Sequence, residues 1–127
     1  MSRQIINTPN APAPIGPYNQ AVKAGNTLYV SGQIAINPET GALVQDDIQA
    51  ETHMVMKNLQ GILTAAGLGF GDIVKCSIFV SDMGNFAEIN EVYGSYFEKD
   101  PPARETVEVS ALPKYVNVEI SCIAVAS

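Results

Sequence analysis

The chain has 127 residues, 46% of them hydrophobic, and a formal net charge of −6. This length fits one domain over residues 1–127, and the apolar content excludes a disordered chain. The chain is acidic and has no basic run, so we expect neither nucleic acid nor a membrane surface as a partner.

The cysteine and histidine content limits the possible chemistry. Cys76 and Cys122 each lie in an apolar run, which favours buried free thiols, although one disulfide stays possible from sequence alone. His53 is the only histidine, so we expect no metal site and no Ser-His-Asp or Cys-His catalytic set. The N-terminal stretch is polar and the apolar runs are short, so we expect a cytoplasmic protein.

The first half of the chain predicts a strand followed by a helix. Proline and glycine in Asn10–Val22 exclude a regular helix there. The β-branched and aromatic run Asn26–Asn37 predicts a strand. Apolar residues at helical spacing predict a helix over Asp46–Gly67, with Asp46 or Asp47 as its N-cap and Gly67 after its last turn.

The second half predicts a strand over 72–82, a helix over 85–99 and strands over 104–110 and 116–126. Asn85 is the expected N-cap of the second helix, and Pro101-Pro102 ends it. We expect the element order β-β-α-β-α-β-β, in which a first strand without an assigned range precedes the strand Asn26–Asn37. This order predicts an α+β fold in which both helices cover one face of a mixed sheet.

Strand alternation predicts which side chains face away from the helices. In the last strand, Val118 and Ile120 are expected toward the helices and Glu119 on the opposite face. The same alternation sends Val107 toward the helices and Arg104 and Thr106 to the face of Glu119. A mixed polar and apolar face of this kind suits a subunit interface with a small-ligand cleft.

Arg104, one of two arginines, is the first candidate site residue. It is either a solvated strand-end charge or a bidentate clamp for a carboxylate. Glu119 lies between apolar neighbours, so it is either a structural ion-pair partner or a general acid/base. The two side chains meet within a hairpin, or across a subunit interface if their strands are not neighbours; the sequence leaves both arrangements open.

Four further residues have both a structural and a functional interpretation. Tyr18 either packs or orients a ligand through its hydroxyl, and Ser31-Gly32 either ends a strand or lets a ligand approach the backbone. Asn90 is either an exposed helix residue or part of a site. If the protein is an enzyme, its chemistry must depend on positioning, an anion clamp and one proton shuttle.

Several stretches together resemble the RidA/YjgF/UK114 family of reactive-intermediate (imine/enamine) deaminases. They include "APIGPYNQAV", "LYVSGQIAINPETG", "PPARETVEVSALPK" and "VNVEISCIAV", and the resemblance covers the whole chain in order. It implies a chorismate-mutase-like α+β fold and a homotrimer with three clefts between its subunits. It also implies cofactor-free hydrolysis of 2-iminobutanoate or 2-iminopropanoate to a 2-keto acid and ammonia.

The resemblance also assigns roles to single residues. Arg104 matches the residue that binds the substrate carboxylate, and Glu119 matches the acid that places or activates water. The cleft-lining positions that match are Tyr18, Ser31, Gly32 and Asn90. Thr106 stands where many members have a cysteine, and Glu105 stands where a small residue is common. The alternative function is a non-catalytic binder or sensor of small carboxylates, such as 2-keto acids, on the same trimeric fold.

Overall fold

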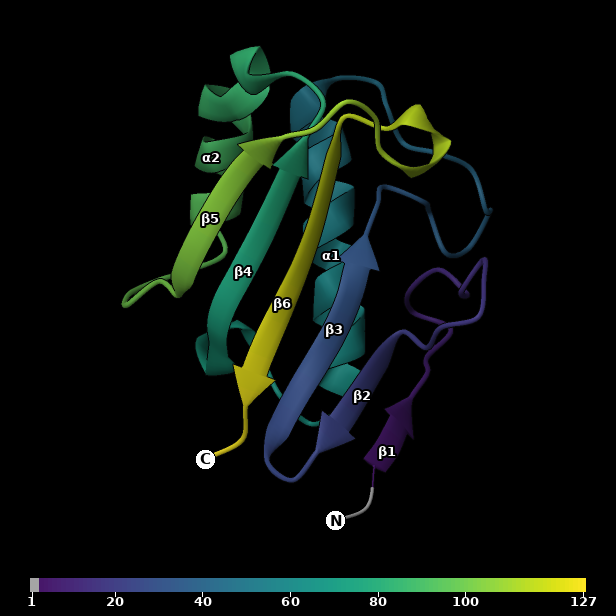
Figure 1. Ribbon diagram of the computed structural model, residues 1–127, viewed down its shortest axis with the longest axis vertical. Helices are drawn as coiled ribbons and strands as arrows, with labels where there is room; N and C mark the ends of the chain where they lie inside the picture. The colour runs from purple at the N-terminus through teal and green to yellow at the C-terminus, as the bar shows by residue number, and fades with distance from the viewer. Residues whose placement is uncertain (1–2) are drawn as a thin grey trace.

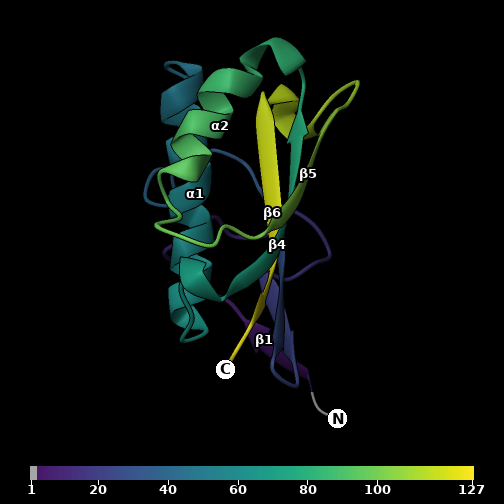
Figure 2. The same ribbon diagram turned by 90° about the vertical axis from the view of Figure 1, so that its left-hand side faces the viewer.

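The computed structural model describes residues 3–127, which form one six-stranded sheet and two α-helices on one of its faces (Figures 1 and 2). The strands are β1 (Arg3–Ile6), β2 (Ala21–Ala24), β3 (Thr27–Gln33), β4 (Ile73–Val80), β5 (Ala103–Glu108) and β6 (Val118–Val125), and the helices are α1 (Ile48–Ala65) and α2 (Phe86–Gly94). Short 3-10 turns cover Phe70–Asp72, Met83–Asn85 and Pro113–Tyr115. The predicted α+β fold with a mixed sheet is confirmed, and three strands precede α1 where the predicted order has two.

The strand order across the sheet is β1-β2-β3-β6-β4-β5. All neighbouring strands are antiparallel except β4 and β5, which are parallel. Helix α2 joins these two strands, as a parallel crossover requires. β5 and β6 are therefore not a hairpin: β4 lies between them, and β5 forms an edge of the sheet.

Helix α1 follows its sequence signals closely. The Asp47 side chain accepts a hydrogen bond from the Ala50 N–H at 2.7 Å, and Gly67 adopts φ +77° after the helix end. Helix α2 differs from its prediction, because it ends at Gly94. Asn85 holds the expected N-cap position of α2, but its side chain makes no capping hydrogen bond. Asn85 also ends a 3-10 turn that Asp82 caps by accepting from the Gly84 N–H.

The main core lies between the sheet and the two helices. Leu28, Leu59 and Ile120 are fully buried in it, together with Cys76, the register partner of Cys122. Both cysteines are buried free thiols as predicted, and burial raises the pKa of Cys122 to about 12. Within residues 3–127, no helix is long and apolar enough to cross a membrane.

The opposite face, which we call the open face, carries no α-helix within residues 3–127 (Figure 2). One end of it is partly covered by a small apolar cluster of Ile34, Ile36, Leu112 and Val116. Ile34 and Ile36 alternate with Ala35, which belongs to the main core, so the cluster lies on the other side of the sheet. Loops gathered over this cluster create the walls of the candidate site.

Candidate active site

A cavity of about 390 Å³ opens next to this cluster and contains the Glu119 side chain. Four residues singled out from the sequence line it, namely Tyr18, Ser31, Gly32 and Glu119. The rest of the lining is mainly apolar: Pro12, Ala13, Ile15, Gln20, Gln33, Ile34, Ile36 and Pro113. The structure therefore brings most of the predicted site residues into one hollow.

A β-bulge forms the floor of the cavity. Val30 pairs with Cys122, but the next pair is Gln33 with Ile120, so β3 has one residue more than β6 between the two pairs. The extra residue falls at Ser31-Gly32 and breaks the strand alternation there. A Cβ atom on Gly32 would lie 2.5 Å from Oε2 of Glu119, so glycine is the residue that leaves room for this carboxylate.

Glu119 faces the cavity from the middle of β6. Its neighbours Val118 and Ile120 are fully buried in the main core, so the predicted alternation of this strand is confirmed. Among the described residues, none forms a hydrogen bond or ion pair with its carboxylate. Partial burial raises the pKa of Glu119, which moves this group toward the range useful for proton transfer.

The cavity wall over residues 8–18 has no helix or strand, and Gln20 holds one end of it in place. The Gln20 side chain is 2% exposed, and its Nε2 donates to the carbonyl oxygens of Thr8, Ala11 and Pro12 at 3.0, 3.2 and 2.9 Å. Its Oε1 accepts from the Thr8 N–H at 2.7 Å. The sequence did not single out Gln20, because its partners lie on a loop whose path only the fold defines.

Two of the predicted residues are tied to the same wall. The Ser31 hydroxyl donates to the Asn19 carbonyl at 2.7 Å, which leaves its oxygen free to accept from a ligand. The Tyr18 hydroxyl accepts from the Ile15 N–H at 3.4 Å, and its side chain is 46% exposed at the rim. Both groups are thus oriented before any ligand arrives.

Arg104 does not share a face with Glu119, so the prediction from strand alternation is wrong for β5. Arg104 pairs in register with Cys76, and Thr106 with Ile78, and both partners point into the main core. Val107 instead lies on the open face and is 40% exposed. The reason is that β5 is an edge strand and that α2 covers its inner side. Aromatic rings and an amide on α2 interact favourably with a cation there, so this side of β5 does not need to be apolar.

The guanidinium of Arg104 is held by α2. Its Nη1 donates to Oδ1 of Asn90 at 2.7 Å. Its central carbon lies 5.5 Å from the ring centroid of Phe86 and 5.1 Å from that of Tyr93. Among the described residues no carboxylate forms an ion pair with it. Asn90 therefore contacts Arg104, and the sequence pointed to Asn90 but not to Phe86 or Tyr93.

Two buried hydroxyl groups next to this arginine lack partners. Thr106 Oγ1 makes no hydrogen bond within the described residues, and Thr106 lies two positions from Arg104 on the same face of β5. The Tyr93 hydroxyl likewise has no partner of hydrogen-bond geometry. Burial raises the pKa of Tyr93, with the Cys76 thiol beside it acting in the same direction, so this hydroxyl stays a neutral donor.

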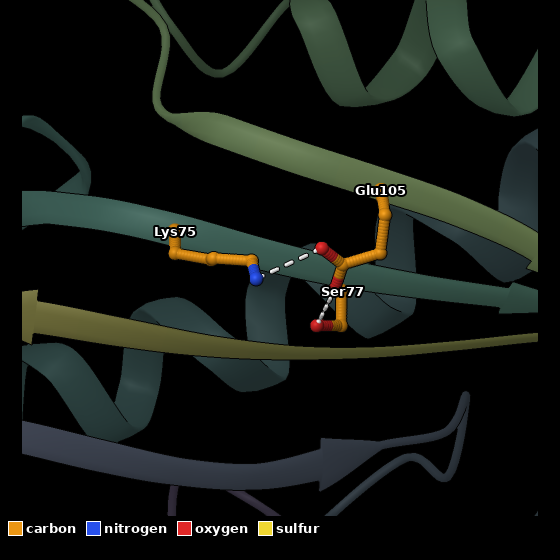
Figure 3. A network of polar contacts seen from close by, with 3 residues as sticks. All are labelled: Lys75, Ser77 and Glu105. Atoms are coloured by element: carbon orange, nitrogen blue, oxygen red, sulfur yellow. Dashed lines mark hydrogen bonds and ion pairs between the residues drawn. The ribbon is translucent and has the colours of Figure 1, made fainter.

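Glu105 lies on the open face, the face that holds Glu119. It accepts a hydrogen bond from Ser77 and pairs with Lys75 at 2.9 Å (Figure 3). The hydrogen bond from Ser77 and the charge of Lys75 lower the pKa of Glu105. This carboxylate is thus already engaged by neighbours on β4, whereas Glu119 is not.

The chain therefore has two half-sites on opposite faces of its sheet. One is the cavity with Glu119, Tyr18 and Ser31, and the other is Arg104 with Thr106 at the β5 edge. Side chains on opposite faces of a sheet cannot converge on one small ligand. Of the two arrangements that the sequence left open, the hairpin is excluded.

Comparison with known proteins gives consistent matches along the whole chain. The family model described as endoribonuclease L-PSP matches residues 8–126. A RutC family protein of Pyrococcus horikoshii is 51% identical over 122 residues, covering 96% of this chain and 97% of that protein. The 2-iminobutanoate/2-iminopropanoate deaminase of Mus musculus is 45% identical over 123 residues, covering 97% of this chain and 91% of the mouse protein.

A solved structure, E. coli TdcF with bound serine, superposes with a TM-score of 0.94 at 43% identity. The match covers 98% of this chain and 99% of that one. Sequence and fold thus agree over nearly the full length, and the resemblance seen in the sequence is confirmed. The chain belongs to the endoribonuclease L-PSP family, which is the YjgF/RidA family.

Proposed function

We propose that this protein is a 2-iminobutanoate/2-iminopropanoate deaminase, which hydrolyses reactive imines to 2-keto acids and ammonia. The observation that carries the proposal is the Arg104 guanidinium, held by α2 with no carboxylate partner in the described chain. A held but unneutralised guanidinium at a strand edge is suited to bidentate capture of a carboxylate. The mouse relative, 45% identical, bears the name of this activity.

We further propose that the two half-sites combine between subunits of a homotrimer. Arg104 and Thr106 of one subunit would face the Glu119 cavity of its neighbour, giving three equivalent clefts. A ring built from one repeated head-to-tail contact satisfies this requirement, because each subunit then presents both halves. The edge position of β5 makes Arg104 accessible for such a contact.

The chemistry needs one clamp and one proton shuttle. Arg104 holds the substrate carboxylate and so fixes the imine carbon, which is electrophilic when the imine nitrogen is protonated. Glu119, ionised at the start, accepts a proton from a water as the water oxygen bonds to that carbon. The resulting carbinolamine receives this proton on nitrogen. As the C–N bond breaks, the hydroxyl proton passes through Glu119 to the departing ammonia, so that ammonium ion and the 2-keto acid leave. Glu119 returns to its ionised form, and proton transfer of this kind contributes about a hundredfold or more.

The description of the matched family as an endoribonuclease points to a different substrate. The net charge of −6 is unfavourable for binding a polyanion, whose affinity rests on neutralising phosphates with Lys and Arg. TdcF, whose structure contains serine, holds a small molecule that carries a carboxylate. We therefore favour a small carboxylic acid as the ligand of this chain.

A coupled assay tests the proposal. A serine/threonine dehydratase generates the imine, and release of the 2-keto acid is followed with and without this protein. Arg104→Ala is expected to abolish both acceleration and 2-keto acid binding. Glu119→Gln is expected to retain binding and to slow turnover by about a hundredfold or more.

The assay with the unchanged protein also separates a deaminase from a carboxylate binder. A binder would bind 2-keto acids through Arg104 without accelerating release from any parent amino acid. Full turnover by Arg104→Ala would disprove the role of this residue as the clamp.

A further inference from the structure

Three side chains of α2 contact the Arg104 guanidinium, and they share one face of the helix. Phe86, Asn90 and Tyr93 have the spacing i, i+4 and i+7, which stacks side chains along one stripe. Each makes a separate contact with the same group: an amide hydrogen bond at 2.7 Å and two ring contacts at 5.5 and 5.1 Å. Over two of its turns, this nine-residue helix therefore contacts the side chain of Arg104.

These contacts differ in kind and together define the orientation of the guanidinium. Rings attract a cation over their faces, so Phe86 and Tyr93 stabilise the charge without using any of its N–H groups. Asn90 uses a donor on Nη1 and leaves the other N–H groups without a partner among the described residues. The two ring contacts therefore leave these N–H groups for a carboxylate, which a guanidinium binds through two N–H groups at once.

We propose that Phe86, Asn90 and Tyr93 form a guanidinium holder that positions Arg104 before the substrate arrives. Asn90 then acts on Arg104 and not on the substrate, and the two rings are positioning residues. The inference rests on the proposed function only for the role of Arg104 as the carboxylate clamp. Its gain is preorganisation, because a side chain already fixed loses little conformational freedom when the ligand binds.

Ordinary core packing is the competing explanation for Tyr93, which is 4% exposed and lies 4.9 Å from the Phe97 ring centroid. The two explanations differ in one respect. A holder built for a guanidinium binds this ion even when Arg104 is missing, whereas a packed core has no affinity for it. Free guanidinium, at millimolar concentrations far below the denaturing range, is therefore the probe.

The first measurement is binding of guanidinium chloride to Arg104→Ala, by NMR titration with sodium chloride as the reference salt. We expect saturable binding. Adding Phe86→Leu or Tyr93→Leu should weaken it roughly three- to thirtyfold, because one cation–ring contact is lost. Tyr93→Phe keeps the ring and should keep the affinity. Phe97→Leu removes a ring that packs against Tyr93 but is not one of the three side chains of the holder, and it serves as the matched control for general core loosening.

Asn90→Ala in the Arg104→Ala background is the variant whose folding is least at risk, because Asn90 is on the surface. It should also weaken guanidinium binding. In the chain with Arg104 present, Tyr93→Leu should raise the Kd for a 2-keto acid and the KM for the imine more than it lowers kcat. A purely structural role would lower the Tm without this split between KM and kcat.

Equal guanidinium binding by Arg104→Ala with and without the ring substitutions would overturn the inference, and so would absence of saturable binding. The guanidinium titrations do not require deaminase activity. Guanidinium binding that depends on the rings, in a protein that does not accelerate imine hydrolysis, would leave the holder in place and disprove the proposed function.

Discussion

Glu119 combines two properties that a general base needs. It is partly buried beside Gly32, and within the described chain no cation or donor neutralises its carboxylate. Burial disfavours the charged form, so the pKa of Glu119 is raised above its usual value. A base with a raised pKa holds a proton more readily, which is what accepting one from water requires.

The pH dependence of turnover follows from this shift. A base acts only when it is deprotonated, so kcat/KM should fall as pH decreases through the pKa of Glu119 in the free enzyme. Because that pKa is raised, the fall should be centred above 4.5, the ordinary value for glutamate. The measurement is kcat/KM against pH, corrected for uncatalysed hydrolysis of the imine.

Glu119→Gln is the control for this assignment. The residual activity of the variant should lack the acidic limb, since its amide does not titrate. An identical acidic limb in wild type and variant would assign the limb to another group or to the substrate.

The bulge in β3 acts at the scale of a strand, because one inserted residue brings Gly32 against β6. Gly32→Ala would place a methyl group 2.5 Å from Oε2 of Glu119, closer than any stable contact. The carboxylate must then move away from the water that it would activate. We expect kcat to fall tenfold or more, because small misplacements of a catalytic group slow the reaction strongly. The Tm should change little.

Gly94→Ala is the matched control for Gly32→Ala. No atom lies within 4 Å of a Cβ at Gly94, and its backbone conformation suits alanine. The control should keep wild-type kcat. If both variants keep it, the close contact at Gly32 does not determine the position of Glu119.

The comparison of strands shows where sequence patterns predict structure well. In β6, a central strand, Val118 and Ile120 are fully buried, so the core imposes the alternation that the sequence displays. In β5, an edge strand, the valine at 107 lies on the open face and Arg104 lies under α2. A long cationic side chain can cover apolar surface with the methylene groups of its stem. The inner side of β5 can therefore be covered by an arginine as well as by a valine.

The candidate site was predictable to a similar extent. Tyr18, Ser31, Gly32 and Glu119 do line one cavity, and these could be selected from the sequence by residue type and by family resemblance. Gln20, Phe86 and Tyr93 could not, because their roles depend on contacts with groups distant in the chain. The relative position of Arg104 and Glu119 could not be predicted either. β4 lies between β5 and β6, and the two side chains lie on opposite faces of the sheet.

At the scale of the whole molecule, the open face has the composition of an interface. It exposes Tyr29 at 52% and Val107 at 40%, next to the charged pair of Lys75 and Glu105. Apolar side chains interspersed with satisfied polar groups are typical of surfaces covered by another subunit. The homotrimer that we propose would cover this face and would bring the two half-sites together.

Mixing two impaired variants tests whether each cleft takes Arg104 and Glu119 from different chains. Arg104→Ala keeps Glu119, and Glu119→Gln keeps Arg104, so a head-to-tail ring that contains both chains has one cleft of three with both original residues. If equal amounts are unfolded together and reassembled at random, about three quarters of the trimers are mixed, so about a quarter of wild-type activity should return. Variants reassembled separately and then combined without exchange are the control, and they should stay at the level of the parents. A site within one chain would recover nothing in either preparation, because no chain in the mixture carries both residues.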